Sequence, residues 1–291
     1  MTAAARLRSL LAQPGAVTAP GAYDALTARI IEASGFPAIY MTGFGTSAAL
    51  LGQPDIGLLS AAEMVENAGR IVQAVQVPVI ADADTGYGNP LNVARTVRAY
   101  EAAGVAGLHL EDQVAPKKCG HMTGKLVVPT SEMVQKLRAA VDARRDPDLL
   151  IIARTDARAV NGLDDAIERG ARYLEAGADM LFVEAPESEA EVERIARSFD
   201  RPLLYNWAES GRTPPIPLAR IEALGYKLVI YPVTALFAAT RAVMQAMELL
   251  RRDGDSGRFQ ADLIHFADFN SFIGLPAAQE MESRYATPGE A

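Results

Sequence analysis

Residues 175–184 read EAGADMLFVE, in which a glycine separates the end of an amphipathic stretch from a short apolar run. Glycine can adopt the left-handed conformation that ends a helix at little steric cost. An apolar run of this length after such a junction is typical of a buried strand. A similar glycine junction and apolar run recur at residues 33–42, 102–111 and 223–231. The recurrence is a weak internal repeat of a helix followed by a strand.

Eight units of this kind account for most of the chain. Short strands that alternate with longer amphipathic helices form parallel βα units, and eight units predict a closed (β/α)8 TIM-type barrel. A doubly wound open sheet is the alternative. The predicted strands are residues 16–19, 38–42, 79–82, 107–111, 150–155, 180–184, 203–206 and 228–231. The predicted helices are residues 23–34, 61–75, 91–103, 132–145, 164–176, 189–199, 218–224 and 235–250.

The length of the chain fits one large domain. Barrels of this class reach about 200–250 residues or more around one core, so residues 1–291 are expected to form a single barrel domain. Residues 252–257 read as a linker because they are rich in glycine and aspartate. Residues 258–285 are then predicted to be a C-terminal helical extension that packs between subunits.

Composition excludes several classes of protein. Hydrophobic residues make up 49% and charged residues 22% of the chain, which is typical of a globular protein. The net charge of −8 argues against nucleic-acid binding. With one cysteine the chain forms no internal disulfide, and it has no zinc-type spacing, so a reducing, cytoplasmic setting is expected. No signal peptide and no run of about 18 apolar residues that could span a membrane is found.

Carboxylates follow two neighbouring strands. Asp82 and Asp84 lie at the end of the third strand, and Glu111 ends the fourth. The active site of a parallel barrel lies at the carboxyl ends of its strands, so these side chains are expected to converge. An all-oxygen set of this kind suits Mg²⁺, with Mn²⁺ as an alternative. Asp82 and Asp84 could instead hold a glycine-rich turn, and Asp55 is either a further acidic member or a turn residue.

An arginine follows the apolar run of the fifth strand. The guanidinium of Arg154 would reach the barrel mouth, where its planar set of donors could bind a substrate carboxylate at two points. The alternative is a structural ion pair with Glu184 or Asp156, and both functions could hold at once.

Two further features of the strand ends give weaker evidence of a functional site. Gly43 and Gly45 could expose backbone N–H groups to an anionic substrate. His109 would lie on the same strand face as Glu111, and we expect it to be a core histidine.

A polar segment follows the fourth strand. Residues 114–125 read VAPKKCGHMTGK, which is too polar and glycine-rich for a buried element and is typical of a functional loop that closes over a substrate. Lys117, Lys118 and His121 are expected to lower the pKa of the Cys119 thiol, so that it exchanges protons near neutral pH. The alternative is a free cysteine on a mobile anion-binding loop.

These motifs together resemble the isocitrate lyase and phosphoenolpyruvate mutase superfamily, and KKCGH at residues 117–121 resembles the signature of its lyase branch. The likeness covers essentially the whole chain through the eighth strand. It implies a barrel whose last helix packs on a neighbouring subunit, usually in a dimer of dimers. Further motifs in family order are YMTG at 40–43, PD at 54–55, DADTGYG at 82–88, EDQ at 111–113, ARTD at 153–156, EAP at 184–186 and YP at 231–232.

The resemblance also implies a role for each matching residue. Asp82 and Asp84 match residues that hold Mg²⁺ directly or through water, and Asp55 and Glu111 match residues that order its water shell. The residues that match a substrate-binding role are Thr42, Gly43 and Phe44 for the α-keto acid half, Arg154 for its carboxylate, and Gly120 and Asn206 for the other product. The candidate catalytic residues are Cys119 as proton donor, Tyr40 near the reacting hydroxyl, Lys117, His121, Arg154 and Glu184.

The resulting hypothesis is a carbon–carbon lyase. Its expected substrate is a small anionic 2-hydroxy di- or tricarboxylic acid, cleaved to an α-keto acid such as pyruvate and a carboxylic acid. Ala208 and Phe237 stand where tricarboxylate-cleaving relatives carry a hydroxyl residue and an arginine, which favours a 2-alkylmalate or dimethylmalate-like acid over methylisocitrate. One alternative is a phosphonate-chemistry enzyme, namely a phosphonopyruvate mutase or hydrolase or a carboxyphosphonoenolpyruvate mutase. Another is an inactive barrel with a binding or structural role.

Overall fold

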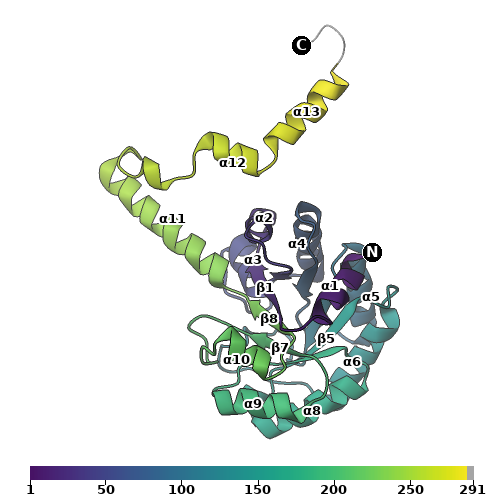
Figure 1. The fold of residues 1–291 in the computed structure, drawn as a ribbon. Coiled ribbons are helices and arrows are strands. Elements are labelled where there is room, and N and C mark those ends of the chain that lie inside the picture. Colours follow the sequence, from purple (N-terminus) through teal and green to yellow (C-terminus); the bar gives the residue numbers. More distant parts are fainter. Residues whose placement is uncertain (287–291) are drawn as a thin grey trace. The chain divides into compact units, whose positions relative to one another are not determined.

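The computed structural model describes residues 1–286, and within them eight parallel strands form a closed barrel in chain order (Figure 1). Each strand pairs with the next, and β8 pairs with β1. The predicted (β/α)8 barrel is therefore confirmed, and the open sheet is excluded. The strands are β1 Val17–Ala22, β2 Ile39–Met41, β3 Val79–Asp82, β4 Gly107–Glu111, β5 Leu150–Thr155, β6 Met180–Val183, β7 Leu203–Asn206 and β8 Leu228–Tyr231.

A helix follows each strand, as predicted. Further helices lie in the predicted helical extension at residues 258–285 and at positions where the sequence pattern does not predict a helix. The helices that match the predicted ones are α2 Ala25–Ala33, α4 Ala61–Ala74, α5 Pro90–Ala102, α6 Thr130–Ala143, α8 Leu163–Glu175, α9 Glu189–Ser198, α10 Leu218–Ala223 and α11 Thr234–Asp253. The others are α1 Ala3–Leu11, α3 Gly43–Leu51, α7 Arg158–Asn161, α12 Phe266–Phe272, α13 Leu275–Tyr285 and the 3-10 turn η1 Gln260–Asp262.

The chain divides into two compact units, Met1–Phe237 with the barrel and a second unit that begins at Ala238. The last five residues of the predicted domain lie outside the described part. In the second unit, Phe259 is the one buried residue among those described. No helix within residues 1–286 is long and apolar enough to cross a membrane.

Two apolar layers hold the first unit together. One fills the space between the strands and the surrounding helices, and the other fills the inside of the barrel. Helix α1 closes the amino-terminal end of the barrel, where Leu7 is fully buried in the inner layer. Arg8 fastens the same helix by a 3.0 Å contact from Nη2 to Asp179 Oδ1. The opposite end of the barrel, with the carboxyl ends of the strands, is left open to polar side chains.

We expect Leu7→Ala to lower the free energy of unfolding by about 2–5 kcal/mol, because it leaves a cavity in the inner layer that the rigid barrel cannot collapse around. Denaturant titration followed by circular dichroism measures the loss. Ser9→Ala, an exposed change in the same helix, is the control. Equal stability of the two variants would contradict the assigned role of α1.

Candidate active site

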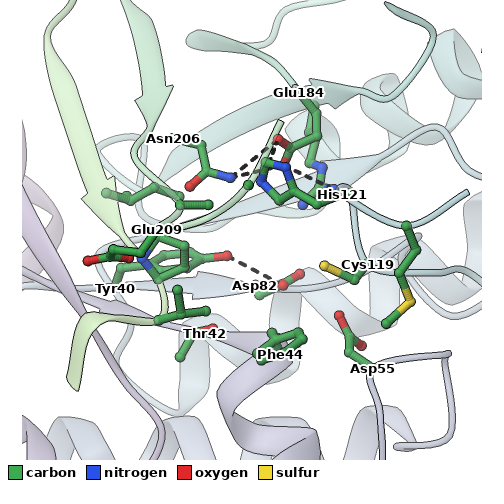
Figure 2. A pocket seen from close by; sticks show the side chains of 18 of the residues that line it. Tyr40, Thr42, Phe44, Asp55, Asp82, Cys119, His121, Glu184, Asn206 and Glu209 are labelled. Carbon is green, nitrogen blue, oxygen red and sulfur yellow. Dashed lines mark hydrogen bonds and ion pairs between the residues drawn. The ribbon is translucent and has the colours of Figure 1, made fainter. Parts of the chain in front are cut away.

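A cavity of about 300 Å³ lies at the carboxyl ends of the strands (Figure 2). Most of the predicted site residues line it, and three others contact residues in its wall: Gly43 lies against Asp82, Asp84 contacts Lys117, and Glu111 contacts Arg154. The predicted residues in the wall are Tyr40, Thr42, Phe44, Asp55, Asp82, Lys117, Cys119, Gly120, His121, Arg154, Glu184 and Asn206.

Helix α3 begins beside this cavity. Thr42 caps it, because its Oγ1 accepts a hydrogen bond of 3.2 Å from the N–H of Gly45. A Cβ at Gly43 would lie 2.4 Å from Asp82 Oδ2, so any other residue there would displace the Asp82 carboxylate. The segment from Gly43 to Gly45 is thus the N-terminus of a helix, and its partial positive charge favours an anion.

A lysine lies among the acidic residues. Lys117 Nζ is 2.6 Å from Asp55 Oδ1 and 2.7 Å from Asp84 Oδ1. Asp55 is therefore a member of the acidic group and not only a turn residue. Asp82 Oδ1 accepts a hydrogen bond from the N–H of Asp84, which has a left-handed φ of 47°. The Asp82 carboxylate therefore holds the turn and also faces the cavity, so the two roles predicted for it do not exclude each other.

Tyr40 contacts both His109 and Asp82. The Tyr40 hydroxyl is 2.8 Å from His109 Nε2 and 3.4 Å from Asp82 Oδ2. Burial lowers the pKa of His109 to about 4, so the ring is neutral at pH 7, and it is fully buried as expected of a core histidine. Burial, followed by the charge of Asp82, raises the pKa of Tyr40 well above its usual value. Tyr40 is thus a hydrogen-bond donor unless a cation lies near its oxygen.

Arg154 contacts three carboxylates. Its Nε lies 3.2 Å from Glu111 Oε2 and 2.9 Å from Asp156 Oδ2, and its Nη2 lies 3.2 Å from Glu184 Oε2. The ring of Phe182 covers the guanidinium at 5.0 Å. The alternative of a structural ion pair is therefore present, and the guanidinium also lines the cavity.

The opposite wall is built around Glu184. Asn206 Nδ2 donates to Glu184 Oε2 at 3.2 Å, and His121 Nε2 lies 3.6 Å from Glu184 Oε1. Figure 2 shows these three side chains directed toward one another above the cavity. The next residue, Ala185, has a left-handed φ of 55° and donates its N–H to Glu184 Oε1 at 2.7 Å. Alanine is strained in this conformation, which turns the chain back over the carboxylate.

Cys119 faces the cavity, with its sulfur directed toward the side of Asp82 in Figure 2. The expected lowering of its thiol pKa is wrong. Burial raises the pKa to about 11, and the charges of Asp55 and Glu184 add to the rise. Lys118 is turned to Gly124, to whose carbonyl its Nζ donates at 3.0 Å. The thiol is therefore protonated at pH 7.

The buried acids of this region outnumber the buried cations. The acids are Asp55, Asp82, Asp84, Glu111, Asp156 and Glu184, and the cations are Lys117, Lys125 and Arg154, all less than a tenth exposed. Burial raises the pKa of Asp84 to about 6, with the charges of Asp82 and Asp55 adding to the rise, and it raises the pKa of Glu111 well above its usual value. Such a group favours either bound protons or an added cation.

The same residues could hold a divalent cation through water. Among residues 1–286, no three His, Cys, Asp or Glu side chains lie close enough to chelate an ion together. Glu111 Oε1 is buried without a hydrogen bond, and such an oxygen suits a water molecule around an ion. Mg²⁺ commonly keeps several waters and uses one or two carboxylates. The donor set therefore fits a hydrated Mg²⁺ or Mn²⁺.

Two residues near the site were not predicted from the sequence. Lys125 contacts Asp156 at 2.7 Å, and Glu209 lines the cavity while accepting a hydrogen bond from the Thr234 hydroxyl. A third lysine in a polar loop gives no signal of burial. Glu209 follows its strand by three residues, so the direction of its side chain could not be derived from strand alternation.

Comparisons with known proteins agree with this geometry. A family model described as phosphoenolpyruvate phosphomutase matches residues 7–251. The chain is 52% identical over 287 residues to a 2,3-dimethylmalate lyase of Eubacterium barkeri, with 99% of each chain covered. The structure of an oxaloacetate acetylhydrolase with 3,3-difluorooxalacetate superposes with a TM-score of 0.93 at 38% identity, covering 97% of each chain. A phosphonopyruvate hydrolase solved with oxalate and Mg²⁺ gives a TM-score of 0.89 at 33% identity, covering 98% of this chain and 99% of the other.

Because Asp84 must be ionised to bind a cation, we expect Mg²⁺ affinity to be constant above its pKa of about 6 and to fall roughly tenfold per pH unit below it. Isothermal calorimetry between about pH 7 and about pH 5 measures the change, and Asp84→Asn should bind weakly without this dependence. An affinity that is independent of pH in the wild type would show that Asp84 does not control the site.

Proposed function

The chain belongs to the phosphoenolpyruvate mutase and isocitrate lyase superfamily, whose members are metal-dependent, and we propose from this premise that it is a carbon–carbon lyase that cleaves a 2-alkylmalate or dimethylmalate-like acid to pyruvate and a carboxylic acid. The observation that carries the proposal is the placement of a protonated thiol, Cys119, in a cavity whose other walls carry Arg154 and the acidic group. A proton donor facing an anion site is what cleavage to a carbanion requires.

The cofactor of the reaction is proposed to be Mg²⁺, with Mn²⁺ as an alternative. Asp82 and Asp84 would hold the ion directly or through water, with Asp55 and Glu111 ordering its water shell. When bound, a divalent cation supplies positive charge that stabilises developing negative charge on substrate oxygens. Lys117 already provides a fixed charge on the same side of the cavity.

The substrate carboxylates and carbonyl have separate partners. We propose that Thr42, Gly43 and Phe44, at the N-terminus of α3, receive the α-keto acid half through backbone N–H groups. Arg154 would bind the carboxylate of that half through donors not used by its three acids. Gly120, His121 and Asn206 would face the other product, with Glu184 holding His121 and Asn206 in place.

Cleavage requires one proton to leave the substrate and one to return. A base accepts the proton of the 2-hydroxyl, the C2–C3 bond breaks, and its electron pair passes to C3 and the adjacent carboxylate as an enediolate. Cys119 then donates its thiol proton to C3. Tyr40 is proposed to contact the hydroxyl, and its raised pKa makes it a hydrogen-bond donor there unless bound cations lower that pKa.

The cavity wall favours an alkyl group over a third carboxylate. Ala208 and Phe237 both line it, and the Phe237 ring meets the edge of Phe44 at 6.3 Å. Neither side chain can form a hydrogen bond or ion pair with an extra carboxylate. That carboxylate would lose its hydration without gaining a partner in the protein. Ile230 and Val233 extend this apolar side. Phe237 stands where tricarboxylate-cleaving relatives carry an arginine, and this difference supports a dicarboxylate substrate with methyl substituents.

The assembly and setting are proposed from likeness to the family. We propose a cytoplasmic homo-oligomer, a dimer of dimers, in which one barrel domain per chain carries residues 258–285 as a helical extension against a neighbouring subunit. Exposed apolar side chains on the second unit, such as Met244, Phe266 and Met281, support this because a partner would cover them.

Assay of purified protein with Mg²⁺ and a panel of acids tests the function. The panel contains 2,3-dimethylmalate, other 2-alkylmalates, 2-methylisocitrate, oxaloacetate and phosphonopyruvate, with identification of any keto acid released. Pyruvate from an alkylmalate is the expected result. Product from phosphonopyruvate alone would establish the phosphonate alternative, and no metal binding and no product from any acid would establish the inactive barrel.

Cys119→Ser is expected to lower turnover about 100-fold or more, because a hydroxyl is a much weaker acid than the thiol it replaces. Keto-acid binding, measured by calorimetry with pyruvate, should stay nearly unchanged. Met122→Leu, a volume-conserving change in the same loop, is the control and should keep its activity. Full turnover by the serine variant would remove Cys119 from the chemistry.

A further inference from the structure

Lys125 joins the loop that carries Cys119 to the strand that carries Arg154. Its Nζ lies 2.7 Å from Asp156 Oδ1 and also donates to the backbone carbonyl of Gly120. The Lys125 side chain is 2% exposed and that of Asp156 is fully buried. An ammonium group is withdrawn from water only when charged or polar acceptors compensate it, so this contact has a defined geometry rather than a fluctuating surface position.

The carbonyl that Lys125 holds belongs to the residue between Cys119 and His121. Gly120 is pressed against the opposite wall, since a Cβ there would lie 2.6 Å from both Arg154 Nη2 and Glu184 Cγ. Asp156, the other partner of Lys125, accepts a hydrogen bond of 2.9 Å from Arg154 Nε. The Lys125 ammonium therefore links the loop, through Asp156, to Arg154, and this is the same arginine against which Gly120 packs.

The loop is attached at two ends by buried ammonium groups. Lys117 fastens the first end to Asp55 and Asp84, which belong to the acidic group. Lys125 fastens the second end to Asp156, which contacts Arg154 and is not one of the proposed metal ligands. The contacts of Lys117 would change when a cation enters the acidic group, whereas those of Lys125 involve none of the proposed metal ligands.

Asp156 does not depend on Lys125 alone. Burial by itself would raise the pKa of Asp156, yet the charges of Arg154 and then Lys125 hold it below its usual value. Its backbone N–H also donates to Asp112 Oδ1 at 2.9 Å. Without the lysine, the carboxylate keeps two contacts to Arg154 at 2.9 and 3.2 Å, so the strand end remains ordered while Gly120 loses its donor.

We propose that Lys125 is a positioning residue that holds the loop of residues 114–125 closed, by tying the Gly120 carbonyl to Asp156 and thereby placing Cys119 against the substrate. The inference rests on the proposed function only for the consequence in turnover. The placement of the loop itself can be measured without any reaction, because Cys119 is the single cysteine of the chain and its alkylation reports on exposure of this loop alone.

The test compares Lys125→Met with Lys136→Met. Lys136 is a matched control because it is similarly buried and paired to Glu132 at 3.4 Å in α6, away from the loop. Alkylation of Cys119 by iodoacetamide is followed by mass spectrometry on the whole protein, with thermal unfolding measured in parallel. We expect Lys125→Met to speed alkylation roughly tenfold or more, the effect of losing a charge-assisted hydrogen bond, and Lys136→Met to leave the rate unchanged.

Turnover supplies a second readout in the same variants. A loop that is open more often should lower kcat of Lys125→Met with a smaller change in KM, since keto-acid contacts at α3 and Arg154 persist. Faster alkylation with full turnover would mean that Cys119 is not the donor, which overturns the proposed chemistry but leaves the positioning role standing.

Equal alkylation rates in the two lysine variants would overturn the positioning role. If Lys125→Met does not fold, Lys125→Gln replaces it, because the uncharged and shorter amide can reach only one of the two acceptors. Its alkylation should still exceed that of Lys136→Gln severalfold. A rate equal to that of the control would overturn the inference.

Discussion

The guanidinium of Arg154, buried against Glu111, Asp156 and Glu184, is the interaction on which the arrangement of the site depends. These acids come from the end of β4, the end of β5 and the end of β6, so one side chain joins three successive strands at the barrel mouth. Arginine suits this place because its planar group carries five donors and stays charged when buried. A lysine ammonium is a single point charge and lacks the planar set of donors with which Arg154 contacts all three carboxylates.

The excess of buried acid beyond these pairs accounts for the chemistry. Asp84 and Glu111 have raised pKa values because burial and neighbouring carboxylates disfavour their charged forms. The same low polarity raises the pKa of Cys119 and keeps its proton in place. One environment therefore produces both a demand for a cation and a neutral acid that can give up a proton. The two halves of the proposed reaction have a common electrostatic cause.

Close approach of backbone to charged side chains completes the site. Gly43 lies against Asp82, and Gly120 lies against Arg154 and Glu184, so closely that a Cβ at either glycine would displace these charged side chains. The left-handed Ala185 places a strained residue directly after Glu184. Such strain is kept only where surrounding contacts over-determine the conformation. Lys117 and Lys125 attach the loop of residues 114–125 to the rest of the site. Two backbone N–H groups add to this attachment: that of Cys119 donates to Asp55 O at 3.0 Å, and that of Arg212 donates to His121 Nδ1 at 3.1 Å.

The local pattern of the sequence was sufficient for the barrel and for the residue types at its mouth. Glycine junctions precede several of the apolar runs, and Asp82, Glu111 and Arg154 lie at the same end of the barrel because parallel strands share one direction. Resemblance to the family added the matching of Cys119, Tyr40 and Asn206 to a site. The tertiary structure alone decided that residues 43–45 begin a helix, that the Cys119 pKa is raised and that Lys125 is buried. These three depend on burial and on partners distant in the chain, and a residue's solvation and its distant neighbours are not encoded in the spacing of the residues beside it.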